Sequence, residues 1–275
     1  MSDQPPPGYH EVTRSSSTTT GKSKDDRSNF ALLSFSGSDR LRLLRFPDEL
    51  TPYVVEMIGK GWFKGIQDVK HGEEGVEVKL RGNPFVHGLD DEKRAIRKLI
   101  LEILDMLAKE GWVVIPAGGV GKIAYYSPHG EKGPSILYYS QIPEARILMR
   151  AGSLIFQRQQ PQDLGAFCIS FDSRDLIHLI NATSALAQSV MTTFGNKIES
   201  CNQDLMSGNF EIKFRDHLWW QPTKKGSLES RLAILQMVQC LDDNGFKLYT
   251  SVDFDNATGG STYQISAEIW YCCRQ

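Results

Sequence analysis

A glycine-rich segment is the first place where this sequence could do chemistry. Residues 116–122 have the sequence Pro-Ala-Gly-Gly-Val-Gly-Lys and follow an expected strand. Phosphate-binding loops hold phosphates with glycine amides and a lysine, but they also need a glycine where Pro116 stands and a hydroxyl where Ile123 stands. Because both are missing, we expect an ordinary loop, and Lys122 remains an anion-ligand candidate only through its charge.

The histidines, serines and cysteines form no complete catalytic or metal-binding pattern. Six histidines are scattered without H-x-x-x-H or C-x-x-H spacing. One of them, His178, alternates with apolar residues in an expected strand, and we interpret it as a structural residue. No G-x-S-x-G elbow or thiol-protease signature is present. The sequence therefore predicts no metal and no cofactor, and it favours a non-enzymatic protein.

Four arginines are the other candidate ligands for an anion. Arg81 and Arg215 end two similar charged strands, and Arg97 and Arg231 lie near the start of two similar helices. A guanidinium at the helical positions either pairs with a carboxylate of its own module or binds an anion between modules. We expect the internal ion pair. The alternative function is an anionic-ligand or small-molecule binder, or an enzyme, with these arginines and Lys122 around a site between the modules.

A short motif near the N-terminus points to a protein partner. Pro6, Pro7 and Tyr9 belong to a Pro-Pro-Gly-Tyr sequence, which resembles the Pro-Pro-x-Tyr ligand of WW domains. In such ligands the prolines lie in an aromatic groove and the tyrosine enters a second pocket. The resemblance implies recruitment by a WW-domain protein, for example a ubiquitin ligase of that type. Trp220, which precedes Gln-Pro, is the aromatic residue that we expect to be exposed to a partner.

Two stretches of the chain predict the same elements in the same order. In the first stretch, apolar spacing predicts strands at 30–35 and 41–46, a helix over about 47–60, strands at 66–70 and 76–81, a helix over about 91–110 and a strand at 112–115. Without a gap, residues 77–111 align with 211–245 at eight identical positions, where chance gives about two. Three of these identities lie in the strand, and five lie in the long helix and its cap. The closing strand is 268–271 in the second copy, whereas both 136–139 and 154–156 qualify in the first.

We therefore predict an α+β protein made of two tandem copies of one module. Each module is expected to be an antiparallel sheet with a short and a long helix on one face. The predicted boundaries are a disordered tail rich in Pro, Ser and Thr at 1–29, a first module with an inserted loop at 30–160, and a second module at 161–275. Strand residues 77–81 and 211–215 place charged side chains on one sheet face, which we interpret as a solvated face with cross-strand ion pairs; a partner surface is the alternative.

Composition disfavours several functional classes. The chain has 31 Lys+Arg and 33 Asp+Glu, so its net charge of −2 lacks the cationic field of a nucleic-acid binder. It has no apolar run of about 20 residues to cross a bilayer, and its first residues lack the apolar core of a secretory signal. Five cysteines without C-x-x-C spacing indicate reduced thiols. We expect a cytoplasmic protein-interaction or adaptor protein. The sequence leaves open the nucleus, the partner, the oligomeric state and whether the two modules share one continuous sheet.

Overall fold

The computed structural model describes residues 29–85, 90–115, 152–173, 175–204, 208–218, 224–253 and 268–275. These residues form two antiparallel six-stranded sheets and four α-helices, so the α+β prediction is confirmed. The candidate residues that lie outside the described ranges are Pro6, Pro7, Tyr9, Lys122 and Trp220. The glycine-rich segment and the possible strand at 136–139 lie outside them as well.

The first module contains the sheet with strand order β3-β4-β2-β1-β6-β5. Its elements in chain order are β1 (Phe30–Ser36), β2 (Arg40–Leu44), α1 (Thr51–Gly61), β3 (Ile66–Gly72), β4 (Gly75–Leu80), α2 (Asp90–Lys109), β5 (Trp112–Val114) and β6 (Ser153–Arg158). The strand at 153–158 closes this sheet between β1 and β5. It includes residues 154–156, one of the two expected closing segments.

The second module repeats this topology strand for strand. Its elements in chain order are β7 (Phe167–Phe171), β8 (Leu176–Ile180), α4 (Ser184–Phe194), the short 3₁₀ helix η3 (Gly195–Lys197), β9 (Ile198–Asp204), β10 (Asn209–Phe214), α5 (Lys224–Asp243), β11 (Phe246–Asp253) and β12 (Glu268–Arg274). The strand order β9-β10-β8-β7-β12-β11 is that of the first module with each strand replaced by its counterpart. The duplication is confirmed, and the two modules form separate sheets rather than one.

The ends of two helices show where local chemistry decides the boundaries. The short helix begins at Thr51 and not near Pro47 as expected; the Pro47 carbonyl accepts the N–H groups of Leu50 and Thr51 in a turn that leads into the helix. The long helix α2 ends at Lys109, and Gly111 just after it adopts the expected left-handed conformation with a φ of 79°. A Cβ there would lie 2.6 Å from the Gln159 carbonyl oxygen, so both conformation and space require glycine.

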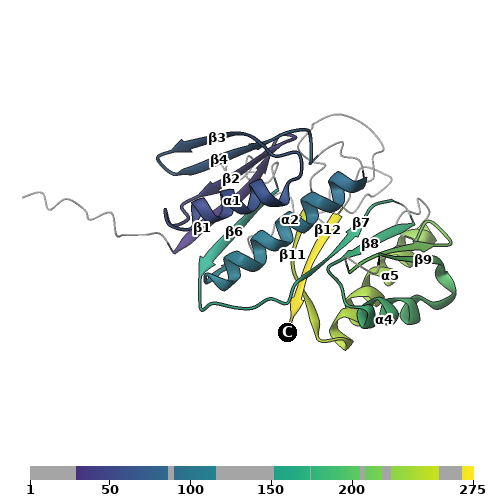
Figure 1. Cartoon of the computed structure of the whole chain (residues 1–275). Helices are drawn as coiled ribbons and strands as arrows, with labels where there is room; N and C mark the ends of the chain where they lie inside the picture. The colour runs from purple at the N-terminus through teal and green to yellow at the C-terminus, as the bar shows by residue number, and fades with distance from the viewer. Residues whose placement is uncertain are drawn as a thin grey trace, which may run out of the picture.

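Helix α2 lies between the two sheets (Figure 1) and is buried on two sides. One stripe at helical spacing, Ile96, Leu99, Ile103 and Leu107, packs with α1 and the first sheet. A second stripe, Arg97, Leu101, Leu104 and Ala108, is also buried, and α2 contacts β7 and β8 of the second module. The long helix of the first module therefore also covers the second sheet.

The central strands of the second sheet are consequently buried on both faces. Ile169 and Phe171 of β7 pack in the core under α4 and α5, whereas the intervening Cys168 packs in the core shared with the first module. All five residues of β7 are buried, while the burial of its counterpart β1 alternates along much of the strand. A strand with continuous burial is what a sheet covered on both faces requires.

Candidate functional site

A buried ion pair joins the two modules. Arg97 on α2 places its guanidinium against the carboxylate of Asp172, the residue that follows β7, and both side chains are less than a tenth exposed. Arg97 Nη1 donates to Asp172 Oδ2 at 2.8 Å, and Nη2 donates to Oδ1. Ser170 donates its hydroxyl to the same carboxylate at 3.0 Å. This two-pronged geometry is the strong form of a charge-assisted hydrogen bond.

His178 extends this ion pair into a cluster. Its Nδ1 hydrogen-bonds to Asp172, and its Nε2 lies 3.2 Å from Glu211 Oε2 on the neighbouring strand β10. Asn202 donates its amide to the other oxygen of Glu211 at 3.2 Å. We call Arg97, Asp172, His178 and Glu211 the interface cluster; in it the two carboxylates lie on either side of the imidazole, and the guanidinium pairs with one of them.

Burial and charge act in opposite directions on Asp172. Burial by itself raises the pKa of its carboxyl, but the hydrogen bond from His178 and the charge and hydrogen bonds of Arg97 outweigh burial and hold the pKa well below its usual range. Nearby, burial raises the pKa of the Cys168 thiol to about 12. The carboxylate is therefore ionised at neutral pH, whereas this thiol is neutral and unsuited to nucleophilic attack.

The interface also contains a neutral hydrogen bond at its other end. The Val114 N–H of β5 donates to the Tyr249 hydroxyl of β11 at 2.8 Å. Burial raises the pKa of this tyrosine to about 12, so its hydroxyl stays neutral. Together with the interface cluster, this contact fixes the two modules at two separated points.

The four candidate arginines do different things. Arg97 makes an ion pair, but the expectation that its partner lies in its own module was wrong, because Asp172 belongs to the second module. Arg81 donates to the Ile66 carbonyl at 3.4 Å and Arg215 donates to the Ile198 carbonyl at 3.1 Å, so each fastens the edge strand of its own sheet. Arg231 lies exposed on α5. The structure thus does not gather these four arginines around one site.

The charged strand faces carry the expected cross-strand ion pairs. Glu77 on β4 accepts hydrogen bonds from Arg40 at 3.1 Å and Arg42 at 2.7 Å on β2. The hydrogen bond from Arg42 is the main cause of a lowered Glu77 pKa. In the second module, His178 and Glu211 occupy the positions of Arg42 and Glu77 in the pairing registers. The interface cluster is therefore a modified version of a surface ion pair.

Sequence comparison of the two copies missed Asp172. Its counterpart in the first module is Ser36, which lies two residues after Ser34 as Asp172 lies two after Ser170. A comparison that looks only for identical residues does not detect a position at which the two copies differ. The signal was instead a difference between the copies, a carboxylate in one where the other has a hydroxyl.

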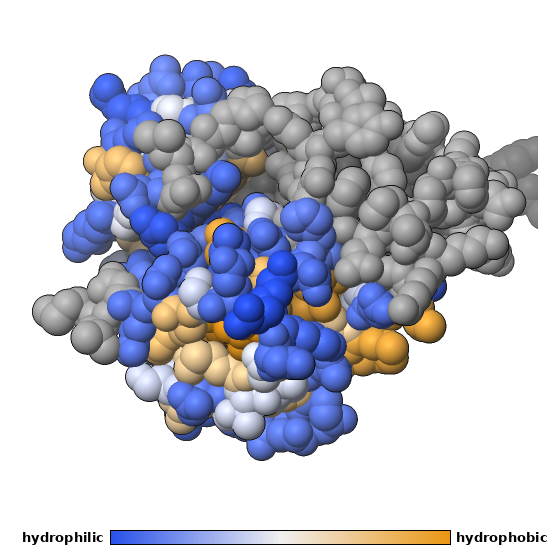
Figure 2. Space-filling view, turned by 90° about the vertical axis from the view of Figure 1, so that its right-hand side faces the viewer, coloured by the Kyte–Doolittle hydropathy of each residue, from blue (hydrophilic) through white to orange (hydrophobic). Residues whose placement is uncertain are grey.

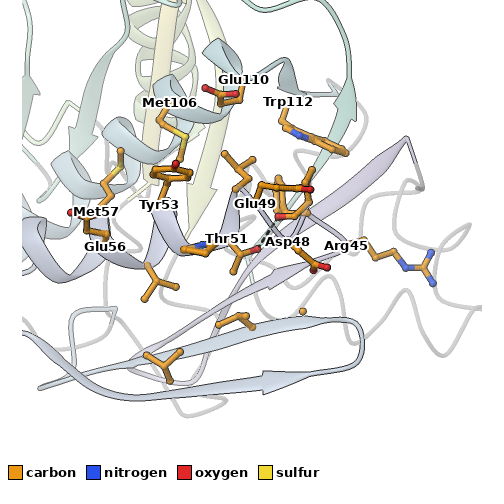
Figure 3. A pocket seen from close by; sticks show the side chains of 18 of the residues that line it. Arg45, Asp48, Glu49, Thr51, Tyr53, Glu56, Met57, Met106, Glu110 and Trp112 are labelled. Carbon is orange, nitrogen blue, oxygen red and sulfur yellow. Dashed lines mark hydrogen bonds between the residues drawn. The ribbon is translucent and has the colours of Figure 1, made fainter. Parts of the chain in front are cut away.

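A separate groove lies in the first module, between α1, α2 and the β3–β4 hairpin. Its volume is about 2320 Å³. Figure 3 shows Tyr53 and Met57 of α1 beside Met106 of α2, with Trp112 toward one end. Arg158 lies 5.4 Å from the centre of the Trp112 ring. The groove therefore combines aromatic and thioether side chains with charged groups at its edge.

Neither a cluster of metal-binding side chains nor a membrane-spanning helix is found among the residues that the structure describes. None of these residues form a group of three or more His, Cys, Asp and Glu side chains that could hold a metal ion. None of the helices in this part of the chain is both long enough and apolar enough to span a membrane.

Comparison with known proteins identifies the repeated unit. No curated protein and no solved structure matches the chain significantly. One domain-family model of uncharacterised function matches it in two regions, residues 29–122 and 166–273, which together cover well over half of the chain. Each region begins next to the first strand of a module. The chain thus belongs to this domain family and carries the domain twice.

Proposed function

We propose that this chain is a non-enzymatic cytoplasmic adaptor protein whose first module binds a basic, partly apolar peptide segment of a partner. The observation that carries the proposal is the groove between α1, α2 and the β3–β4 hairpin. The interface cluster supports the non-enzymatic part, because its charged groups are bonded to one another across the module boundary. The five free cysteines suit a reducing compartment.

The apolar part of the groove suits side chains of a peptide. Tyr53 is 66% exposed and Phe63 is 61% exposed, although both are large aromatic residues. Met57 and Met106 lie beside Tyr53 (Figure 3), and methionine adapts its shape to different partners. Exposed aromatic residues next to methionines are typical of peptide-binding surfaces.

Charge determines which peptides fit. The groove is lined by seven acidic residues against four Lys and Arg residues. Three of these four cations already pair with groove carboxylates: Arg45 with Glu74, Lys60 with Glu56 and Lys98 with Glu102. The surplus is negative, so a segment that carries Lys or Arg beside its apolar residues would be attracted and an acidic one repelled.

The size of the groove separates a peptide from a metabolite. Small-molecule sites usually enclose about 300–1,000 Å³, whereas this groove measures about 2320 Å³. A metabolite would leave most of its surface in water there. An extended or helical peptide of several residues would fill a larger share.

Peptide binding to the full chain tests this proposal. We expect a basic peptide library that contains Leu and Phe to yield binders, measured by fluorescence anisotropy, and Tyr53→Ala to weaken them by about tenfold or more. Leu248→Ala is the matched control, because Leu248 is also exposed, at 44%, but lies on β11 of the other module. Binding that is equal in both variants, or no binding peptide at all, would contradict the groove as the site.

The N-terminal motif would supply the second partner of the adaptor. Pro6, Pro7 and Tyr9 lie outside the described residues, and the proposal for them rests on the Pro-Pro-x-Tyr resemblance. We expect at least one member of a WW-domain panel to bind the intact chain and to lose most of its affinity for Tyr9→Ala. If every domain binds both forms alike, this half of the proposal fails while the groove proposal stands.

A further inference from the structure

The long helix of the second module carries an uncovered apolar stripe. Leu228, Leu232, Leu235 and Val238 are 57%, 51%, 63% and 43% exposed. Their spacing along α5 puts them on one face of the helix. On the side of the molecule turned to the viewer in Figure 2, apolar patches lie among polar side chains. A monomer gains nothing from aligning four large apolar residues toward water.

In the first module, part of the corresponding face of the counterpart helix α2 is covered. Leu235 and Val238 of α5 are the counterparts of Leu101 and Leu104 of α2. The two α2 leucines are 3% and 0% exposed, and they lie four and seven residues after Arg97, on the helix face that meets Asp172 of the second module. At these two positions the repeated helix is thus covered in one module and open in the other, whereas Leu228 and Leu232 correspond to Arg94 and Lys98, which are not buried.

The charges along α5 indicate what would cover the open face. The helix begins with Lys224 and Lys225 and ends with Asp242 and Asp243. Both pairs oppose the helix macrodipole, which favours anions at the N-terminus and cations at the C-terminus. In a second α5 running antiparallel, the helix start that carries the two lysines would lie beside the partner's helix end, which carries the two aspartates and the negative end of the macrodipole.

We propose that two copies of this chain form a dimer through antiparallel packing of α5 on α5. In this arrangement the two-fold axis passes near the middle of the helix, so that Leu232 of each copy lies beside the partner's Leu235. A face that is complementary to itself forms the closed two-fold contact that is commonest among soluble oligomers. The proposal does not depend on the groove of the first module.

The contact area sets the expected strength. A helix of 20 residues is about 30 Å long. One helix pair of this length falls short of the roughly 800 Å² per partner of a standard stable interface. We therefore expect a dimer that dissociates in the micromolar range, about 10 µM, rather than an obligate one.

Sedimentation equilibrium of the full chain tests the dimer. We expect a mass that rises with concentration from 30.9 kDa toward twice that value. Leu232→Glu combined with Leu235→Glu should remain monomeric, and Leu248→Glu, which changes an exposed leucine elsewhere, should dimerise as the wild type does. A wild-type chain that is monomeric to about 100 µM would overturn the proposal.

A charge exchange distinguishes antiparallel pairing from nonspecific association. One variant carries Lys224→Glu and Lys225→Glu, and the other carries Asp242→Lys and Asp243→Lys. Each alone places like charges together and should weaken its dimer by about tenfold or more, whereas a mixture of the two should form a heterodimer. If mixing restores nothing, α5 does not pair in this orientation. Restored pairing also shows that both variants are folded.

Discussion

Replacing Asp172 with asparagine is expected to lower the free energy of unfolding by about 3–5 kcal/mol. The substitution keeps the shape of the side chain but removes the charge that opposes Arg97, which is only 3% exposed. A buried guanidinium without a counter-ion retains its desolvation cost and loses its attraction. The same change removes the carboxylate that accepts from His178. Denaturant unfolding of both forms at neutral pH measures the loss.

An exposed pair on the same helix provides the control. Asp91 pairs with Arg94 on α2, but the Asp91 side chain is 83% exposed. Asp91→Asn should therefore change the free energy of unfolding by no more than about 0.5 kcal/mol. A cost below about 1 kcal/mol for Asp172→Asn would mean that the modules do not depend on this ion pair.

Acid should reveal the same carboxylate in the wild-type chain. Because the pKa of Asp172 is lower in the folded state than its unfolded value of about 3.9, its ionised form stabilises the fold above that pH. This contribution is lost as the pH falls from about 5 through the lowered pKa. We expect the wild-type stability to fall more steeply than that of Asp172→Asn over this range, by up to about 1.4 kcal/mol per pH unit. Equal slopes would contradict a lowered pKa.

The architecture of each module was predictable because its information is local and is present twice. The alternation in strands such as β2, the stripe of α2 and the glycine after it each determine an element from neighbouring residues. The second copy repeats these patterns at matching positions, so each copy supports the interpretation of the other. The separation into two sheets was not predictable, since strand patterns do not say which strands of different copies pair.

The contact between the modules could not be read from the same patterns. Leu101 and Leu104 belong to one broad apolar surface of α2, and nothing in the sequence divides that surface between two sheets. The interface also depends on Asp172, which meets Arg97 only when the chain folds across 75 residues. Such an ion pair depends on the tertiary structure. Residues that are identical in the two copies therefore indicate the shared fold, whereas a residue that differs, Asp172, marks the contact between the modules.

The repeat itself permits a direct test of this division, because one substitution can be made at the same position of both modules. Leu101→Ala should cost about 2–5 kcal/mol, since Leu101 is 3% exposed beneath the second module and its removal leaves a cavity. Leu235→Ala removes the same atoms from α5, where the side chain is 63% exposed, and should cost no more than about 0.5 kcal/mol.

The comparison requires dilute protein, well below about 10 µM, so that pairing of α5 between copies adds nothing to the stability of the wild type. Both alanines favour helix equally, so the difference between the two costs reports the burial of one face and not helix propensity. Equal costs would mean that α2 does not cover the second sheet in solution. A large difference that shrinks as the concentration rises would instead show Leu235 becoming buried by a second copy, as the antiparallel dimer requires.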